Sequence, residues 1–188
     1  VECAYSYEDA IRYLNSQRSF IRNEEPILGP QNVNWEDWGG SDHYFKGAWM
    51  LHTLRHAIND DEIWFDLLKS FHQNNAISNV TTEDFVQHVN RCTKEDYTAF
   101  FEQYLVYPGI PTLEYEVKEA DQNAVEVRYR WQADVTNFKM PVLMGKQGDY
   151  VQVFPTTQEW RTTRLEGLTA KDFQVAKELF YINTRQKN

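Results

Sequence analysis

The feature that most constrains the fold of this chain is a change of hydrophobic period at residues 107–111, "YPGIP". Two prolines and a glycine within five residues end a helix, because proline lacks an amide donor and glycine favours a turn. Before this stretch apolar residues follow helical spacing, and after it they alternate as in half-buried strands. We therefore expect an α+β fold in two parts: an N-terminal α-helical bundle at residues 1–108 and a C-terminal antiparallel β-sandwich at residues 109–188.

The helical part contains several local signals for helix starts. Residues 6–24 begin with a possible capping box, Ser6 with Asp9, and residues 43–58 carry a stripe of apolar side chains. Three acidic residues open the segment at 60–75, where the helix dipole favours negative charge. Two shorter helices are expected after the pairs Thr81–Asp84 and Thr93–Asp96, which have the same spacing.

The second part reads as about seven short strands. Apolar and charged residues alternate in "TLEYEVKEA" and "AVEVRYRW", and "DQN" between them suits a hairpin loop. Further strands fit "MPVLM", "YVQVF", "EWRTTRL", "FQV" and "LFYIN". Helix propensity offers an alternative for "LTAKDFQVAKELF", near the end of the chain. Trp131 falls on the apolar side of its strand, so we expect it in the core.

Charge and hydropathy exclude two classes of partner. The 188 residues carry a net charge of −9, whereas a nucleic-acid-binding protein needs a basic surface to neutralise phosphates. No apolar run approaches the roughly 20 residues that cross a bilayer, so no membrane segment is expected.

The chain start has neither an initiator Met nor the pattern of a signal peptide, so we expect a piece of a longer protein. Its compartment is not readable from these ends, although a periplasmic or extracellular location is favoured over a cytoplasmic one. Cys3 and Cys92 do not form a disulfide framework. We interpret them as buried thiols, with one bridge left open.

His52 and His56 have the spacing of two zinc ligands on one helix face. A hydrolytic zinc site also needs a further ligand and a general base, and Thr53 stands where a glutamate base would be. The pair lies beside the apolar stripe, so a structural role is favoured over a metal site. We expect no metal ligands in this chain.

An ordered series of landmarks is more informative than any one of these residues. The strings are "YFKGAWMLHTLR" at residue 44, "WFDLLKSFHQN" at 64, "TTEDFVQHVN" at 81 and "DYTAFFEQYLVYPGIPTLEYEV" at 96. Over about residues 5–120 this series resembles the C-terminal part of the aminopeptidase-N-like family of zinc metallopeptidases. In that family a Tyr-x-Lys-Gly string begins a helix with a Leu-rich, Arg-ended pattern, matched here by Tyr44, Lys46, Gly47, Leu51, Leu54 and Arg55.

The resemblance implies a specific role for Tyr44. In such enzymes the tyrosine hydroxyl stabilises the oxyanion that forms on the zinc-bound substrate, as a neutral donor aimed at developing charge. By position, this catalytic role falls on Tyr44 alone. Lys46 and Gly47 then have structural roles, with Gly47 permitting close helix packing.

The same resemblance shows what is missing. The family's His-Glu-x-x-His motif and its downstream glutamate precede the tyrosine, and neither is present; Glu2 has no neighbours that identify it with the third ligand. We therefore expect a C-terminal fragment whose parent binds zinc and removes N-terminal residues from peptides. The isolated chain would lack zinc and activity, and its partner would be the missing N-terminal catalytic half.

Two alternatives remain open at the level of sequence. The first is a non-catalytic interaction or scaffold module built on a peptidase-like fold. The second is a binding module that presents Trp131 or Trp160 to ligands such as sugars.

Overall fold

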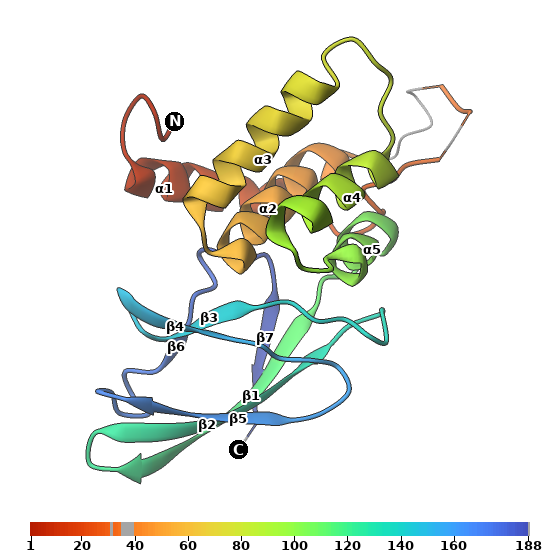
Figure 1. Ribbon diagram of the computed structural model, residues 1–188. Coiled ribbons are helices and arrows are strands. Elements are labelled where there is room, and N and C mark those ends of the chain that lie inside the picture. The colour runs from red at the N-terminus through yellow and green to blue at the C-terminus, as the bar shows by residue number, and fades with distance from the viewer. Residues whose placement is uncertain (31, 35–39, 188) are drawn as a thin grey trace.

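The computed structural model describes residues 1–30, 32–34 and 40–187. Helices lie together at one end of the molecule and strands at the other (Figure 1). The helical elements are α1 (Tyr7–Gln17), the 3₁₀ turn η1 (Arg18–Phe20), α2 (Asp42–Ile58), α3 (Asp61–Asn74), α4 (Thr82–Thr93) and α5 (Thr98–Val106). None of the helices in these ranges is long and apolar enough to cross a membrane.

Side-chain caps begin three of the helices: α1 and α4, where the sequence predicts capping residues, and α3, where it predicts only an acidic start. Thr81 and Asp84 form a complete capping box at α4, each side chain bonding to the other's backbone amide. At α1 the Ser6 hydroxyl accepts from the Asp9 amide, and Asp60 caps α3 in the same way. These bonds satisfy amide groups that have no partner inside the helix.

The capping box predicted at Thr93 and Asp96 is wrong. Thr93 is the last residue of α4, and its hydroxyl donates to the Val89 carbonyl one turn earlier. Lys94 then takes a left-handed conformation, with φ of 59°, which ends the helix. Helix α5 begins at Thr98 without a side-chain cap.

Seven strands follow within the described residues, in two sheets. They are β1 (Thr112–Asp121), β2 (Ala124–Gln132), β3 (Val142–Lys146), β4 (Asp149–Val153), β5 (Arg161–Glu166), β6 (Gln174–Val175) and β7 (Asn183–Gln186). One sheet has the order β5-β2-β1-β7 and the other β4-β3-β6. The fold is therefore mixed α+β, with sheets of four and three strands.

Strands β1 and β2 form the antiparallel hairpin that their alternation predicts. Leu113 pairs with Trp131 and Val117 with Val127, and the chain turns just after Asp121. The apolar members of β2 are buried, so this side of the hairpin faces the core. Trp131 is 1% exposed and its indole donates to the Met140 carbonyl, which confirms the core position expected for it.

One strand pairing departs from the all-antiparallel expectation. Strand β7 pairs with β1 in parallel, with Thr112 opposite Asn183. Parallel neighbours need a crossover connection. Here the chain between β1 and β7 contains all of the strands β2 to β6. Local alternation does not contain this information, because it specifies which residues face the core and not the direction of a neighbour.

The last predicted strand, "LFYIN", is displaced along the chain. Phe180, Tyr181 and Ile182 are buried but lie outside any strand, and β7 begins only at Asn183. The Tyr181 amide donates to the Thr53 hydroxyl of α2, so this segment bonds to a helix and not to a sheet. The helix considered for "LTAKDFQVAKELF" does not form: this segment contains turns and the two-residue β6.

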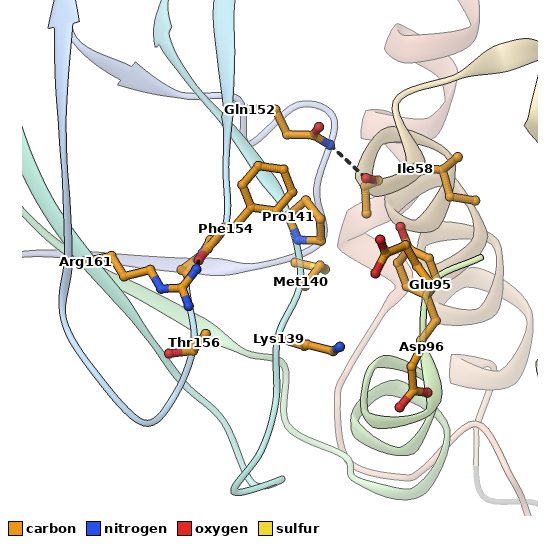
Figure 2. Close-up of a pocket in the computed structure, with 13 residues that line it drawn as sticks. Ile58, Glu95, Asp96, Lys139, Met140, Pro141, Gln152, Phe154, Thr156 and Arg161 are labelled. Carbon is orange, nitrogen blue, oxygen red and sulfur yellow. Dashed lines mark hydrogen bonds between the residues drawn. The ribbon is translucent and has the colours of Figure 1, made fainter. Parts of the chain in front are cut away.

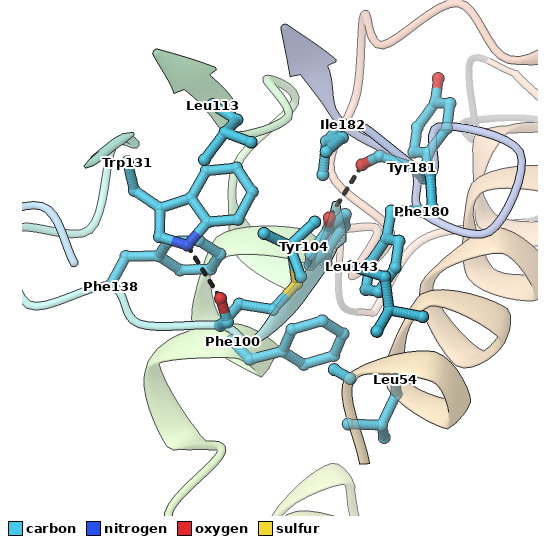
Figure 3. Packing of buried hydrophobic residues seen from close by; sticks show 14 of the residues in the cluster. Leu54, Phe100, Tyr104, Leu113, Trp131, Phe138, Leu143, Phe180, Tyr181 and Ile182 are labelled. Carbon is cyan, nitrogen blue, oxygen red and sulfur yellow. Dashed lines mark hydrogen bonds between the residues drawn. The ribbon is translucent and has the colours of Figure 1, made fainter. Parts of the chain in front are cut away.

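Apolar side chains from helices and strands form one continuous core (Figure 3). Phe100 and Tyr104 of α5 pack with Leu143 of β3 and with Phe180. The Tyr104 hydroxyl donates to the Tyr181 carbonyl at 2.8 Å, which satisfies a polar group that is buried in this core.

Glu114 is buried on the side of β1 that the alternation marks as polar. It is 1% exposed and accepts from Arg130, Arg185 and Lys187 at 2.9, 3.3 and 3.1 Å. Burial raises the pKa of this carboxyl, but the hydrogen bonds from Arg130 and Lys187 lower the pKa by more. The cluster joins β1, β2 and the end of β7.

A buried lysine links the helices to the first strand. Lys46 of α2 is fully buried, and its ammonium group donates to the carbonyls of Tyr107 and Pro108, at 2.9 and 2.7 Å. Tyr107 is the C-cap of α5, where carbonyls have no partner within the helix. Burial lowers the pKa of Lys46 to about 8.

Replacing Lys46 with Met should destabilise the fold. Met has similar length but leaves two carbonyls without a donor, so we expect a loss of about 2 kcal/mol in the free energy of unfolding. Urea denaturation followed by tryptophan fluorescence measures it. The exposed Lys69→Met change on α3 is the matched control and should cost less than about 0.5 kcal/mol. Equal stabilities for the two variants would contradict this role.

Candidate functional site

The start of α2 is held in place by a buried carboxylate. Asp42 is 4% exposed and accepts from the backbone amides of Arg22 and Glu24, at 2.8 and 3.3 Å. These bonds fix the loop that follows η1 against the first turn of α2. The backbone of the first turn of α2 is therefore held in a fixed position.

Tyr44 stands on this first turn and points to solvent. Its side chain is 71% exposed, and its ring lies 4.1 Å from that of His43, measured between centroids. Its hydroxyl forms no hydrogen bond with the described residues. The phenol is thus held on a fixed helix while its donor remains open to a ligand or partner.

Lys46 follows Tyr44 by two residues and points the opposite way. Positions i and i+2 are about 200° apart around a helix, so one can be exposed while the other is buried. The Tyr-x-Lys-Gly string therefore combines an internal anchor with an exposed phenol.

Gly47 does not have the close contact that was expected for it. A Cβ atom built there would meet nothing within 4 Å, because no other element of the described chain packs on this position. Gly47 lies three residues after Tyr44, on the same helix face, and the next residue, Ala48, is exposed. Small residues thus leave space beside the phenol.

The two histidines of α2 lie together inside the protein. His52 is 7% and His56 8% exposed, and their ring centroids are 4.3 Å apart. Nδ1 of His56 lies 2.8 Å from the His52 carbonyl and must donate to it, so Nε2 accepts from the Tyr7 hydroxyl at 2.7 Å. Nε2 of His52 is buried and has no partner among the described residues.

Burial changes the acid–base behaviour of both rings. It lowers the pKa of His52 to about 3, with further lowering by nearby His56 and Arg55. It also lowers the pKa of His56. Both imidazoles are therefore neutral at pH 7.

The described residues contain no group of three or more His, Cys, Asp or Glu side chains that is arranged to hold a metal. The two cysteines are unbridged, and Cys3 is exposed, contrary to the expectation that both thiols are buried. No set of ligands for zinc can therefore be assigned within this part of the chain.

Arg55 has a role that sequence inspection missed. It is 8% exposed and forms ion pairs with Glu2 and Asp61, each at 2.7 Å. The sequence pattern places Asp61 only in an acidic helix start. The ion pairs connect the chain start to the α2–α3 turn, and they raise the pKa of Arg55 while lowering those of both carboxyls.

Trp160 is partly exposed and has cationic neighbours over its ring. Three cations lie over its ring, Arg128, Arg130 and Lys187, at 4.6, 4.7 and 5.2 Å from the centroid. These distances are typical of cation–π contacts. These cations occupy part of the ring surface that a sugar would stack on.

The buried histidines predict a pH dependence of stability. Because the folded pKa of His52 lies below the unfolded value of about 6.5, the unfolded state binds more protons as pH falls. The stability should be full above pH 6.5 and should fall by about 1–2 kcal/mol between pH 7 and pH 5. Urea unfolding at each pH measures this.

The variant His52→Gln should flatten that dependence, whereas the exposed His72→Gln should leave it unchanged. As an independent check, the ring proton resonances of His52 should not titrate above pH 4. A ring titration near pH 6.5 would contradict the burial described above.

Comparison with known proteins finds similarity at the level of structure. Neither a protein-family model nor a curated protein sequence matches the chain. Among solved structures, aminopeptidase A of Legionella pneumophila, in complex with aspartic acid, aligns with 94% of this chain at a TM-score of 0.71 and 17% sequence identity. The chain spans 21% of the length of that protein. The mixed α+β fold of this chain is thus similar to part of an aminopeptidase.

Proposed function

We propose that this chain is the C-terminal part of a zinc-dependent aminopeptidase, whose parent removes N-terminal residues from peptides. The observation that carries the proposal is the extended fold similarity, which covers 94% of the chain, combined with an exposed Tyr44 on a helix anchored by Lys46. In this proposal residues 1–108 are the helical bundle that ends a catalytic domain. Residues 109–188 are a β-sandwich domain.

Tyr44 is the residue of this chain that we assign to catalysis. Its phenol is a neutral hydrogen-bond donor at pH 7, which suits an oxygen that becomes negative as a peptide carbonyl is attacked. Three features favour the assignment: the 71% exposure, a backbone fixed by Asp42, and the space above Gly47 and Ala48. The donor can then meet a substrate without reorganising the fold.

Zinc belongs to the parent in this proposal. The described residues do not fit a zinc site, so we assign its ligands to the remainder of the parent and derive no step through the metal. What this chain contributes is a positioned donor and the scaffold behind it.

The surface around Tyr44 is where we place the missing catalytic half. Phe20 is 51% exposed and packs against Phe45, the residue that follows Tyr44 in the sequence, with ring centroids 5.0 Å apart. Exposed aromatic side chains next to small helix residues are typical of a surface that another part of a protein covers.

Replacing Tyr44 with Phe in the parent enzyme tests the catalytic role. Loss of one oxyanion donor should lower kcat by about 10²–10³, or roughly 3–4 kcal/mol, with a much smaller change in KM. Tyr13→Phe on α1 removes an equally simple hydroxyl from an exposed ring and should leave kcat unchanged. A Tyr44→Phe enzyme within twofold of wild-type kcat would refute the assignment.

The isolated chain provides a second test. After incubation with zinc and dialysis to remove unbound metal, the chain should retain far less than one equivalent of zinc by elemental analysis. It should also not hydrolyse an aminoacyl anilide. Stoichiometric zinc or turnover by this chain would contradict the proposal. A parent without a His-Glu-x-x-His motif would favour the non-catalytic scaffold instead.

A further inference from the structure

A cavity of about 450 Å³ lies between the helices and the strands (Figure 2). One side is formed by the end of α2, at Ile58, and by the α4–α5 connection. The other side is formed by β4 and the segments that flank β3 and β4. Gln152 connects the two sides of the cavity, because its side-chain amide donates to the Ala57 carbonyl at 2.9 Å. The volume lies within the range of about 300–1,000 Å³ that is usual for small-molecule sites.

The two sides of this cavity carry opposite charges. Glu95 and Asp96 lie on the helix side, and Lys139 and Arg161 come from the strand side (Figure 2). The Asp96 carboxylate already accepts from the Thr98 amide at 2.9 Å and is therefore held in one orientation. Hydrogen bonds from Thr98 and, more weakly, the charge of Lys139 lower the pKa of the Asp96 carboxyl. Lys139 extends toward Asp96 but does not form an ion pair with the described residues (Figure 2).

Arg161 is fixed but not fully occupied. Its Nη1 donates to the Phe154 carbonyl at 2.9 Å, and its Nε to Glu159 at 3.3 Å. The Nη2 group has no partner among the described residues. A guanidinium has five N–H donors, so it keeps the capacity to bind a carboxylate.

Tyr97 supplies an unpartnered polar group within the cavity lining. Its side chain is 6% exposed, yet its hydroxyl forms no hydrogen bond with the described residues. Burial, with a smaller contribution from the Glu95 carboxylate, raises the pKa of Tyr97 to about 12, so the phenol stays protonated at neutral pH. The Tyr97 hydroxyl is not fully enclosed, so it is open to the cavity and can donate to a ligand there. Thr156 Oγ1, also in the lining, is buried without a partner among the described residues, and buried hydroxyls normally have one.

Apart from Gln152 and Thr156, the remaining lining is apolar. It includes Met140, Pro141 and Pro155 from the strand side, and Phe154, which is 55% exposed. The site therefore offers an anionic end, a cationic end, an apolar middle and one neutral donor.

We propose that this cavity binds a short peptide in its zwitterionic form. The N-terminal ammonium group lies at Glu95 and Asp96, and the C-terminal carboxylate lies at Lys139 and Arg161. The apolar side chain packs between the two ends, and Tyr97 bonds to a peptide carbonyl. A ligand with a single charge would engage only one of the two sides.

This inference does not depend on the proposed catalytic role. Ile58 lies 14 residues after Tyr44 on α2, which corresponds to roughly 20 Å along the helix axis at 1.5 Å per residue. Binding can be measured on the chain itself, without zinc or turnover. Failure of either proposal therefore leaves the other standing.

Isothermal titration of the chain with the tripeptide Ala-Leu-Ala tests the proposal. We expect a Kd of about 10–500 µM for the free tripeptide. The N-acetylated and the C-amidated tripeptides should each bind at least tenfold more weakly, because each lacks one terminal charge. No binding of the free tripeptide at 5 mM, or equal affinities for the three forms, would overturn the proposal.

Variants locate the binding. Lys139→Gln should weaken binding of the free tripeptide at least fivefold but should not affect the C-amidated form. Tyr97→Phe removes only the hydroxyl and should weaken all forms about threefold to tenfold. Lys146→Gln, an exposed lysine outside the cavity lining, is the matched control and should bind as wild type.

Each variant should also match the wild-type circular dichroism spectrum and urea midpoint, so that a loss of binding reports on the site. Unchanged binding in both Lys139→Gln and Tyr97→Phe would place the peptide elsewhere and overturn the assignment.

Discussion

The position of α2 depends on one buried ammonium group. Lys46 donates to the Tyr107 and Pro108 carbonyls just after α5 ends, where the chain turns toward β1. A lysine with no exposed surface is costly unless its donors are satisfied, and the end of a helix offers carbonyls with partial negative charge. The same contact therefore closes α5 and fixes α2 against the entry to the strands.

This placement gives α2 two different faces. Its inner face carries Thr53 and Leu54, which reach the Tyr181 segment and the common core. Its outer face begins with Tyr44, which the helix holds in place without burying. A fixed backbone beneath an exposed donor is what preorganised stabilisation of a developing charge requires. The scaffold and the candidate site thus share the Lys46 anchor, and Asp42 fixes the first turn that carries Tyr44.

Much of the local structure could be predicted because it depends on neighbours in the sequence. The capping box at Thr81 and the hairpin of β1 and β2 follow from residues a few positions apart. Two of the errors arise where a distant group decides. The Tyr181 amide bonds to a side chain of α2, and β7 pairs in parallel with a strand about seventy residues earlier, as no local pattern indicates. The exposure of Tyr44 was likewise not derivable from its own position.

The histidine pair shows why ligand spacing alone is a weak guide to a metal site. A metal needs imidazole nitrogens with available lone pairs at a common point. In His56, Nδ1 donates to a carbonyl and Nε2 accepts from Tyr7, so both nitrogens are already engaged. In His52, Nε2 is buried against the core. The i, i+4 spacing that would place two metal ligands on one helix face can also place two histidine rings side by side in a buried core. Burial of the rings distinguishes the structural pair from the metal site.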